Sequence, residues 1–490
     1  MPKLPTGALA GLTSATANAA AQFLLVLIVT RMLDLETAGE FFTAMALALM
    51  LAGILRLDSG NGLIYFRARQ DTGAEPQIRD DGGGAGAPDG QQMAKTPAQP
   101  NGQRIAEAPR QPHGWGAAET PAQPNGRRAT EPSGQPNGRR AAEPRNGGGG
   151  AEPRGETKGG WVGEHRDRRP RLVWVAVGPV VVLSLLVSGG LVWGSGENWA
   201  LAVVLPGVVV AEVLVAGTRG RGAMGPTLVL AGVVQPVGQV VLVGGALVAG
   251  ASVPVLLVAW AVPAVPVLVL AGVRVSRDSF GRVGWGEFWR YTGPRSVGAG
   301  VQAVFQRLDI VVVAFLAGPE EAAMYTAATR FKVVGQLVNQ GLAQAVQPRL
   351  IRAIAEGDSA GARRLYRQAT RALMAITWPV WIGYAALAPW LLELFGPSYP
   401  QGVDIALVLS ATMMIATACG MVDVVLIASG RTTASLVNIV SAVTVTIVLD
   451  LMLVPSMGAL GAALGWSGGV LVKNVLPLVQ LHGLRPRIAA

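Results

Sequence analysis

The chain has 490 residues, of which 51% are hydrophobic and 14% are charged, and its formal net charge is +10. Such an apolar composition is typical of a membrane protein. The positive charge does not require nucleic acid as a partner, because Arg and Lys outside one polar tract fall in short loops. A single cysteine, Cys419, excludes an internal disulfide and a cysteine metal site. The three histidines lie in the polar tract or the tail, so we expect no metal centre, no cofactor and no histidine-based catalysis within the membrane.

The first membrane span is expected at 8–33. Its early lysine and alanine-rich start suggest a signal peptide. The stretch is nevertheless as long as a full crossing of about 20 residues and runs directly into a second span, so a cleaved leader is rejected. Three polar residues spaced by four give this span a polar stripe, formed by Ser14, Asn18 and Gln22.

The second span is expected at 41–63, and it carries Arg56 and Asp58 near its cytoplasmic end. A long charged side chain near the end of a span can extend to the membrane interface and leave its stem in lipid. Snorkelling of both residues is therefore the plain alternative to a functional role for either one.

From 67 to 171 the composition changes to Gly, Pro, Gln, Glu and Arg, which cannot bury a core. The tract contains three imperfect copies of one short unit, TPAQPNGQRIAE from Thr96, TPAQPNGRRATE from Thr120 and SGQPNGRRAAE from Ser133. We predict a disordered cytoplasmic insert. The plain interpretation is that the insert is a spacer. Its arginine pairs leave two other functions open, which are contact with anionic lipid and recruitment of a partner enzyme.

The remaining spans follow closely on both sides of a basic amphipathic linker at 274–295. Four precede the linker and six follow it, at 172–193, 199–217, 226–248, 253–273, 296–316, 322–346, 372–395, 403–428, 435–453 and 458–481. The fold class is therefore an all-α polytopic membrane protein with twelve transmembrane helices. Prolines in the fifth and sixth spans predict kinks there.

Loop charge predicts the orientation of these spans. One set of alternate loops contains no Lys or Arg, namely 194–198, 249–252, 318–321, 396–401 and 455–457. The insert, the linker, the stretch 349–371 and the tail are basic. Positively charged loops face the cytoplasm, so we expect both termini and the insert on the cytoplasmic side.

Two lobes are predicted, 1–273 and 274–490, with six spans each. An even number of spans gives both halves the same orientation, as in transporters built from parallel repeats about an axis along the membrane normal. The segment VTRMLDLETAGEFFTA aligns with VAFLAGPEEAAMYTAA and places three pairs of similar residues together, Glu36 with Glu320, Ala38 with Ala322 and Phe41 with Tyr325. The lobes should be related by a pseudo-two-fold axis, with a site between them.

Arg307 and Asp309 lie near the middle of the seventh span, where one charge costs about 2.5 to 3.5 kcal/mol on insertion scales. Two positions apart, they point in different directions on a helix and cannot simply neutralise each other. In the eighth span, polar residues recur on one narrow stripe, at Thr329, Lys332, Gln336, Gln340 and Gln347. Interhelical hydrogen bonding is the plain explanation. A hydrated cavity is the functional one, because intramembrane charge usually marks a substrate path.

Three segments resemble the polysaccharide transporter family of lipid-linked oligosaccharide flippases. This family belongs to the multidrug/oligosaccharidyl-lipid/polysaccharide exporter (MOP) superfamily. The similar segments are RLDIVVVAFLAGPEEAAMYTAATRF, the pair GRTTASLVNIV and LDLMLVPSMGALGAALGWS, and TRMLDLETAGEFFTAMALA. The resemblance implies a bacterial cytoplasmic-membrane protein, not an enzyme. Its implied activity is to move undecaprenyl-diphosphate-linked oligosaccharide from the cytoplasmic to the outer leaflet by alternating access. The implied partners are this substrate and membrane lipids, with polysaccharide assembly enzymes in addition, and the implied state is a monomer.

For that activity the best candidates to hold the diphosphate are Arg307, Arg330 and Lys332, with Arg56 as a weaker one. Asp309 and Asp423 are candidates for pairing with these cations or for coupling transport to ions. Two other functions stay open. A multidrug/cation antiporter of the same superfamily would favour an acidic cavity. A polysaccharide polymerase or acyltransferase should show a large outer loop or an intramembrane histidine.

Overall fold

A computed structural model describes residues 6–72, 170–194, 198–221, 225–277, 281–428 and 432–482 of the chain. These residues are almost entirely helical, and the described part contains no strand beyond one isolated bridge between Arg171 and Arg282. Most of the predicted insert lies outside the described residues. Its first part does not: residues 67–72 belong to a helix, so the boundary predicted at 67 is wrong.

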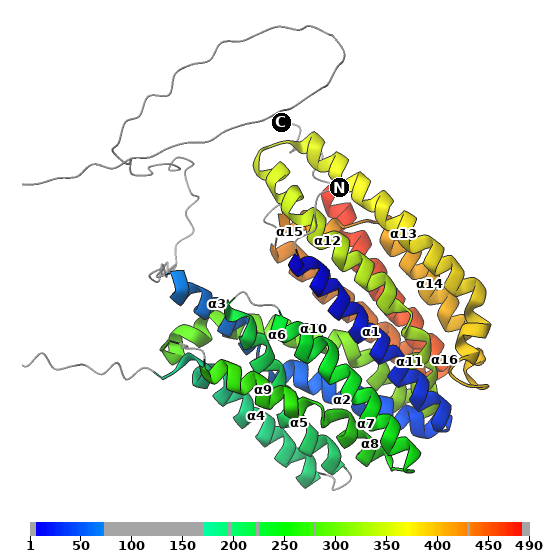
Figure 1. Cartoon of the computed structure of the whole chain (residues 1–490). Coiled ribbons are helices and arrows are strands. Elements are labelled where there is room, and N and C mark those ends of the chain that lie inside the picture. Colours follow the sequence, from blue (N-terminus) through cyan, green and yellow to red (C-terminus); the bar gives the residue numbers. More distant parts are fainter. Residues whose placement is uncertain are drawn as a thin grey trace, which may run out of the picture. The chain divides into compact units, whose positions relative to one another are not determined.

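The first half of the chain folds into helices that correspond to the first six predicted spans (Figure 1). They are α1 (Thr6–Met32), α2 (Leu35–Leu55), α3 (Ser59–Thr72), α4 (Leu172–Gly194), α5 (Trp199–Gly217), η2 (Thr218–Arg221), α6 (Gly225–Val229), η3 (Leu230–Val234), α7 (Gln235–Val248), α8 (Val253–Ala261) and α9 (Ala264–Arg277). The carboxylate of Asp34 accepts a hydrogen bond from the Thr37 amide at 3.0 Å and caps the start of α2. The prolines expected to kink the fifth and sixth spans lie where those spans are interrupted, near η3 and between α8 and α9.

The second half contributes the other six spans. Its helices are α10 (Trp285–Ala317), α11 (Pro319–Thr329), α12 (Lys332–Ala355), α13 (Ser359–Glu393), η4 (Tyr399–Gly402), α14 (Val403–Ala418), α15 (Val422–Ala428) and α16 (Thr432–His482). The linker expected at 274–295 is not separate, because α9 runs to Arg277 and α10 already begins at Trp285.

Nine described helices are long and apolar enough to cross a membrane. One of them, α16, contains two predicted spans joined at Gly458, where the backbone has φ 56° and ψ −134°. Glu321 stabilises this break by accepting a hydrogen bond from the Ala459 amide at 2.8 Å. With α1 and the pair α11 and α12 included, the twelve segments expected from the sequence are present.

Three spans are broken where the sequence indicated continuous helices, the second, the eighth and the tenth, and the tenth is divided between α14 and α15. The second span stops after Leu55 and resumes at Ser59, and the two residues before Ser59, Leu57 and Asp58, have positive φ angles of 48° and 49°. Such angles are uncommon for residues other than glycine and often mark functional sites. The eighth span is interrupted at Arg330 and Phe331, so the single polar stripe expected there is divided between two helices.

The two halves meet around α2, α10 and α11, and α3 also packs against the start of α10, where the Tyr65 ring stacks on that of Tyr291 with centroids 4.0 Å apart. Gly39 of α2 lies so close to Pro319 that a Cβ at Gly39 would collide with the Pro319 carbonyl. These residues belong to the two turns that align with each other in the sequence. Phe23 of α1 adds a contact between the halves, with ring centroids 5.6 Å from Phe331 and 5.5 Å from Phe395.

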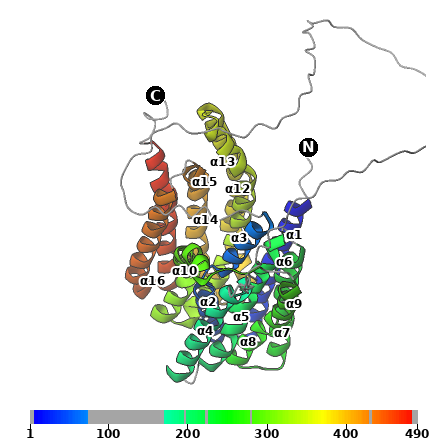
Figure 2. The same cartoon turned by 90° about the vertical axis from the view of Figure 1, so that its left-hand side faces the viewer.

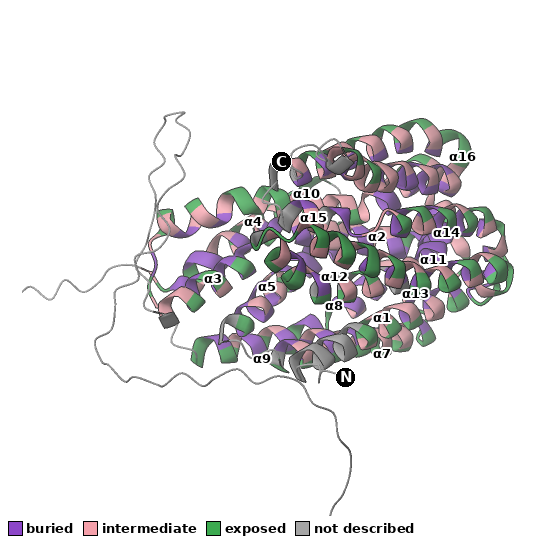
Figure 3. Cartoon of the chain, turned by 90° about the horizontal axis from the view of Figure 1, so that it is seen from above, coloured by how far each residue is buried: buried purple, intermediate pink, exposed green. Residues whose placement is uncertain are grey.

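The outward faces of the helices are apolar. Figure 2 shows α13, α14 and α16 side by side in the second half, and Figure 3 shows exposed residues along the outer faces of α13 and α16. Exposed large hydrophobic side chains on these two helices include Ile376, Ile382, Trp390, Leu451 and Met452. An apolar outer face of this kind is the surface that a helical membrane protein presents to lipid.

Candidate functional site

Asp309 is the centre of a buried polar cluster in the second half. Its Oδ2 accepts a hydrogen bond from the Tyr325 hydroxyl at 2.7 Å, and its Oδ1 lies 2.9 Å from the amide nitrogen of Ile310. Lys332 Nζ lies 3.7 Å from the same Oδ2. The carboxylate is therefore satisfied by a hydroxyl on α11 and an ammonium on α12, which a buried charge requires.

Lys332 is held by aromatic rings as well as by charge. Its Nζ lies 4.2 Å from the ring centroid of Trp466 and 5.4 Å from that of Tyr325. A cation over an aromatic face is attracted by the ring quadrupole, most strongly where water is excluded. These contacts join α12 to α11 and α16, so Lys332 is placed by three surrounding helices.

Arg307 lies on a different side of α10 from Asp309, as their spacing predicts. Glu212 of α5 and Asp309 are within electrostatic range, yet Arg307 forms no hydrogen bond or ion pair with any residue that the structure describes. Arg330, between α11 and α12, is close enough to Arg307 for the two charges to repel each other. The Nε of Arg330 is buried and has no hydrogen-bond partner among the described residues. The two guanidinium groups thus lie within electrostatic range of each other, and neither is paired with a carboxylate that the structure describes.

Arg56 extends this cationic region to the break between α2 and α3. Its Nη1 lies 3.6 Å from Oε2 of Glu212, and the two side chains keep 44% and 34% of their surface accessible. Asp58 instead pairs with Nε of Arg295 at 2.9 Å. Both residues have partners on other helices. Glu212 was not predicted, although a lone carboxylate in the apolar run VVVAEVLVAG is a signal for it.

Asp450 of α16 is a second residue that the sequence analysis missed. Its side chain is fully buried, and neither carboxylate oxygen has a hydrogen-bond partner among the described residues. Asp309 and Lys332 are its charged neighbours. The signal in the sequence is again a single acidic residue in an apolar run, TIVLDLMLV. The sequence analysis named Asp423 instead as a partner for the cations or as a residue that couples transport to ions. Its side chain lies outside the described part of the structure.

The remaining predicted polar residues do not form one continuous lining. Gln22 of α1 donates to Oε1 of Gln239 on α7 at 3.0 Å, whereas Asn18 is exposed. Thr329 is buried and donates its hydroxyl to the Thr326 carbonyl of its own helix. The other predicted lining residues have side chains that are not described, namely Ser14, Gln336 and Gln340. Within the described ranges, no group of three His, Cys, Asp or Glu side chains is arranged to hold a metal ion.

Comparisons with known proteins agree with this architecture. Residues 237–404 match a family of polysaccharide biosynthesis proteins. The structure is similar to a lipid II flippase, MurJ, in an inward closed conformation, with 12% identity, a TM-score of 0.53, and coverage of 63% of this chain and 72% of that chain. It is also similar to an outward-facing multidrug resistance MATE transporter of the MOP superfamily, with 15% identity, a TM-score of 0.53, and coverage of 98% and 94%. The chain is a multi-pass membrane protein with the MOP superfamily fold.

A third MOP transporter is similar over the whole chain. It comes from Pyrococcus furiosus, and the identity is 15%, the TM-score 0.52, and the coverage 99% of this chain and 94% of that chain. The report of that structure describes a binding pocket of reversed polarity that suggests a different function. A search of curated proteins gives no significant match to the sequence. The MOP fold and the match of 237–404 to polysaccharide biosynthesis proteins agree with the resemblance that the sequence motifs indicated.

Proposed function

We propose that this protein is a flippase that moves undecaprenyl-diphosphate-linked oligosaccharide from the cytoplasmic to the outer leaflet. The observation that carries the proposal is the pair Arg307 and Arg330, two guanidinium groups that lie within electrostatic range of each other and have no hydrogen-bonded carboxylate among the described residues. Glu212 and Asp309 lie within electrostatic range of Arg307, but no described carboxylate binds either guanidinium directly, and two cations placed in this way favour a ligand with two negative charges. A diphosphate has that charge, and guanidinium groups bind its oxygens in pairs.

Arg56 and Lys332 complete the proposed diphosphate site in different ways. Arg56 keeps its side chain accessible and shares Glu212 with Arg307, so it would be the first cation that a headgroup entering from the cytoplasmic side meets. Lys332 is engaged by Asp309 and by the Trp466 ring. It would contribute its charge from that position, and full contact with a phosphate would require it to leave Asp309.

Alternating access follows from the way the two halves meet. The contacts between Gly39 and Pro319, and between Phe23 and Phe331, lie at the end expected to face outside. At the opposite end α3 packs on the start of α10, whereas α3 and α15 lie apart (Figure 1). We therefore assign this conformation to the step that receives substrate from the cytoplasmic leaflet. In this proposal the protein works as a monomer in a bacterial cytoplasmic membrane, with both termini inside.

The test is transport of a fluorescent polyprenyl-diphosphate oligosaccharide in liposomes that contain the purified full chain. Arg307→Lys keeps the charge but loses the planar fork, so it should retain partial flipping, while Arg307→Ala and Arg307→Glu should abolish it. Arg349, exposed at the cytoplasmic end of α12, provides the matched control Arg349→Ala, which should flip normally. Full flipping by Arg307→Ala at normal abundance would contradict the proposal.

A multidrug/cation antiporter is the second candidate, and Asp450 is the observation that favours it. A buried carboxylate without a hydrogen-bond partner among the described residues could bind a cation or a proton during transport. In that function a cationic dye should be transported in the same liposomes and Asp450→Asn should stop it, while polyprenyl-diphosphate oligosaccharide should not move. An enzyme stays the distant alternative.

A further inference from the structure

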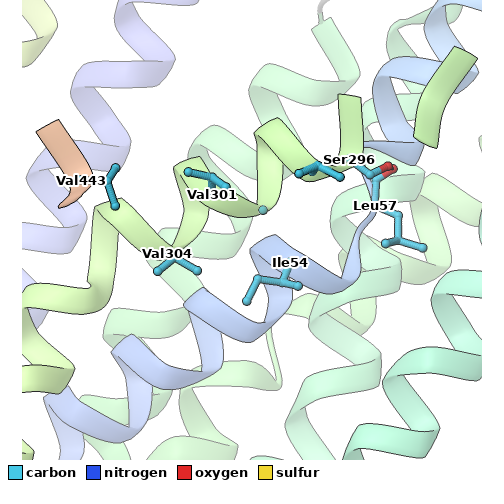
Figure 4. A pocket seen from close by; sticks show the side chains of 8 residues that line it. Ile54, Leu57, Ser296, Val301, Val304 and Val443 are labelled. Carbon is cyan, nitrogen blue, oxygen red and sulfur yellow. The ribbon is translucent and has the colours of Figure 1, made fainter. Parts of the chain in front are cut away.

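An apolar hollow of about 470 Å³ lies where α2, α10 and α16 meet, and Figure 4 shows its side chains. It is lined by Ile54, Leu57, Ser296, Val297, Gly300, Val301, Val304 and Val443. Ser296 is the polar member, and its hydroxyl is already within hydrogen-bond distance of the carbonyls of Leu57 and Thr292. The hollow therefore offers hydrocarbon contact and almost no polar contact to an occupant.

The hollow opens onto the apolar surface of the helical body. Val297 keeps 69% of its surface exposed, and Val440, one turn before Val443 on α16, is also exposed. On α10 the lining residues belong to the first part of the seventh span, on the side expected to be cytoplasmic. An occupant that enters from the inner leaflet would reach it without crossing a polar layer.

One end of the hollow leads to the proposed diphosphate site. Ser296, Gly300, Val304 and Arg307 follow one another at helical spacing along one face of α10, so Arg307 lies one turn beyond the last lining residue. Just after the end of α2, Leu57 lines the hollow and its neighbour Arg56 pairs with Glu212. The positive φ of Leu57 breaks the helix at this point. On α10 and at the end of α2, an arginine therefore follows the apolar lining residues within one turn.

We infer that this hollow binds the isoprenoid chain of the transported lipid next to its diphosphate, a step that rests on the proposed flippase function. The chemistry on each side matches that ligand, because a polyprenyl diphosphate is a hydrocarbon chain joined directly to two negative charges. Only the first units of the chain are bound here, since the space is small, and the rest of the chain remains in the bilayer. An ordinary phospholipid does not fit this arrangement, because its glycerol backbone separates the acyl chains from a single phosphate.

Gly300 provides a variant that fills the hollow without disturbing the fold. A Cβ at Gly300 would meet nothing within 4 Å, so Gly300→Leu projects into empty space and also favours the helix. The matched control is Gly207→Leu on α5. Gly207 lines a second apolar hollow of about 130 Å³, and a Cβ there would likewise meet nothing within 4 Å.

The experiment uses the full chain in phosphatidylglycerol and phosphatidylethanolamine nanodiscs, with a polyprenyl diphosphate that carries a photoreactive diazirine on its second isoprene unit. We expect crosslinks on α10 at 296–304 and at Val443, competed by unlabelled polyprenyl diphosphate. Gly300→Leu should reduce this labelling by about tenfold or more, since loss of two buried methylene contacts is worth that much affinity. Gly207→Leu should leave it unchanged.

Three other outcomes would overturn the inference. Crosslinks that surround Arg307 and Arg330 but miss the hollow would leave the flippase proposal intact and place the chain elsewhere. Labelling of the hollow that phosphatidylglycerol competes equally well would identify it as a site for bulk lipid. The absence of any competable labelling, together with no flipping in liposomes, would reject the flippase proposal itself.

Discussion

Nζ of Lys332 lies 3.7 Å from Oδ2 of Asp309, and this buried ion pair joins the start of α12 to the last third of α10. The two residues belong to different predicted spans. Tyr325 donates to the same oxygen atom, so the pair has both charge and hydrogen-bond compensation. Removal of either partner leaves an uncompensated charge in a membrane interior, whereas removal of both does not.

The first prediction concerns the stability of this pair. Lys332→Met and Asp309→Asn should each lower the free energy of unfolding, by about 3 kcal/mol where the remaining charge stays buried. The double variant should recover most of that loss, because neither charge is then left unpaired. The measurement is the thermal transition of the purified protein in detergent. Asp404→Asn, at an exposed carboxylate near the start of α14, is the control and should change little. Additive losses in the double variant would show that the two residues do not interact.

The second prediction concerns the end expected to face outside, where Arg31 of α1 donates to the backbone of α13. Its guanidinium contacts the Leu394 carbonyl and the Glu393 carbonyl, the latter at 3.0 Å. Phe395 is fully buried beside Phe23 at the same end. Loss of Arg31 should let the halves separate more often, so Phe395→Cys should react faster with an impermeant thiol reagent when Arg31→Ala is present.

The control for this experiment is Glu320→Cys, which is exposed at the same end and should react at the same rate with and without Arg31→Ala. The native Cys419 is replaced by serine throughout. An unchanged rate at position 395 would mean that Arg31 does not hold the two halves together.

The third prediction concerns the insert. Its two ends bind the same short segment: Gln70 Oε1 accepts a hydrogen bond from the Gly281 amide, and the Gly281 carbonyl accepts one from the Leu172 amide at 3.0 Å. A short linker can therefore join the ends without moving α3 or α4. Deletion of residues 73–160 should leave a protein that inserts in the membrane with an unchanged thermal transition. Loss of expression or a lower transition would show that the insert stabilises the fold.

The fourth prediction concerns orientation. Cysteines placed at Gly318 and Ser398 lie in loops without Lys or Arg and should be labelled from outside intact cells. A cysteine at Asp358, between α12 and α13 in the basic stretch, should be labelled only after the cells are opened. Labelling of position 358 in sealed cells would reverse the proposed topology.

Apolar length and loop charge alone were enough to predict the number and order of the spans, because a bilayer imposes one length on every crossing helix. The same logic predicted that Arg307 and Asp309 would face different partners, since their angular separation follows from helix geometry. Helix continuity was harder to predict. The break at Leu57 accompanies a contact with another helix, the pairing of Asp58 with Arg295, and local sequence does not contain that contact.

What only the tertiary structure decided is which charges meet. Glu212 and Arg56 are far apart in the sequence, and they pair at 3.6 Å because α2 and α5 pack together. Asp450 comes within electrostatic range of Asp309 and Lys332 for the same kind of reason, while Arg307 and Arg330 interact electrostatically and have no paired carboxylate among the described residues. A single sequence shows the cost of each intramembrane charge, but it does not show which partner offsets that cost, because the partner is chosen by how distant helices pack.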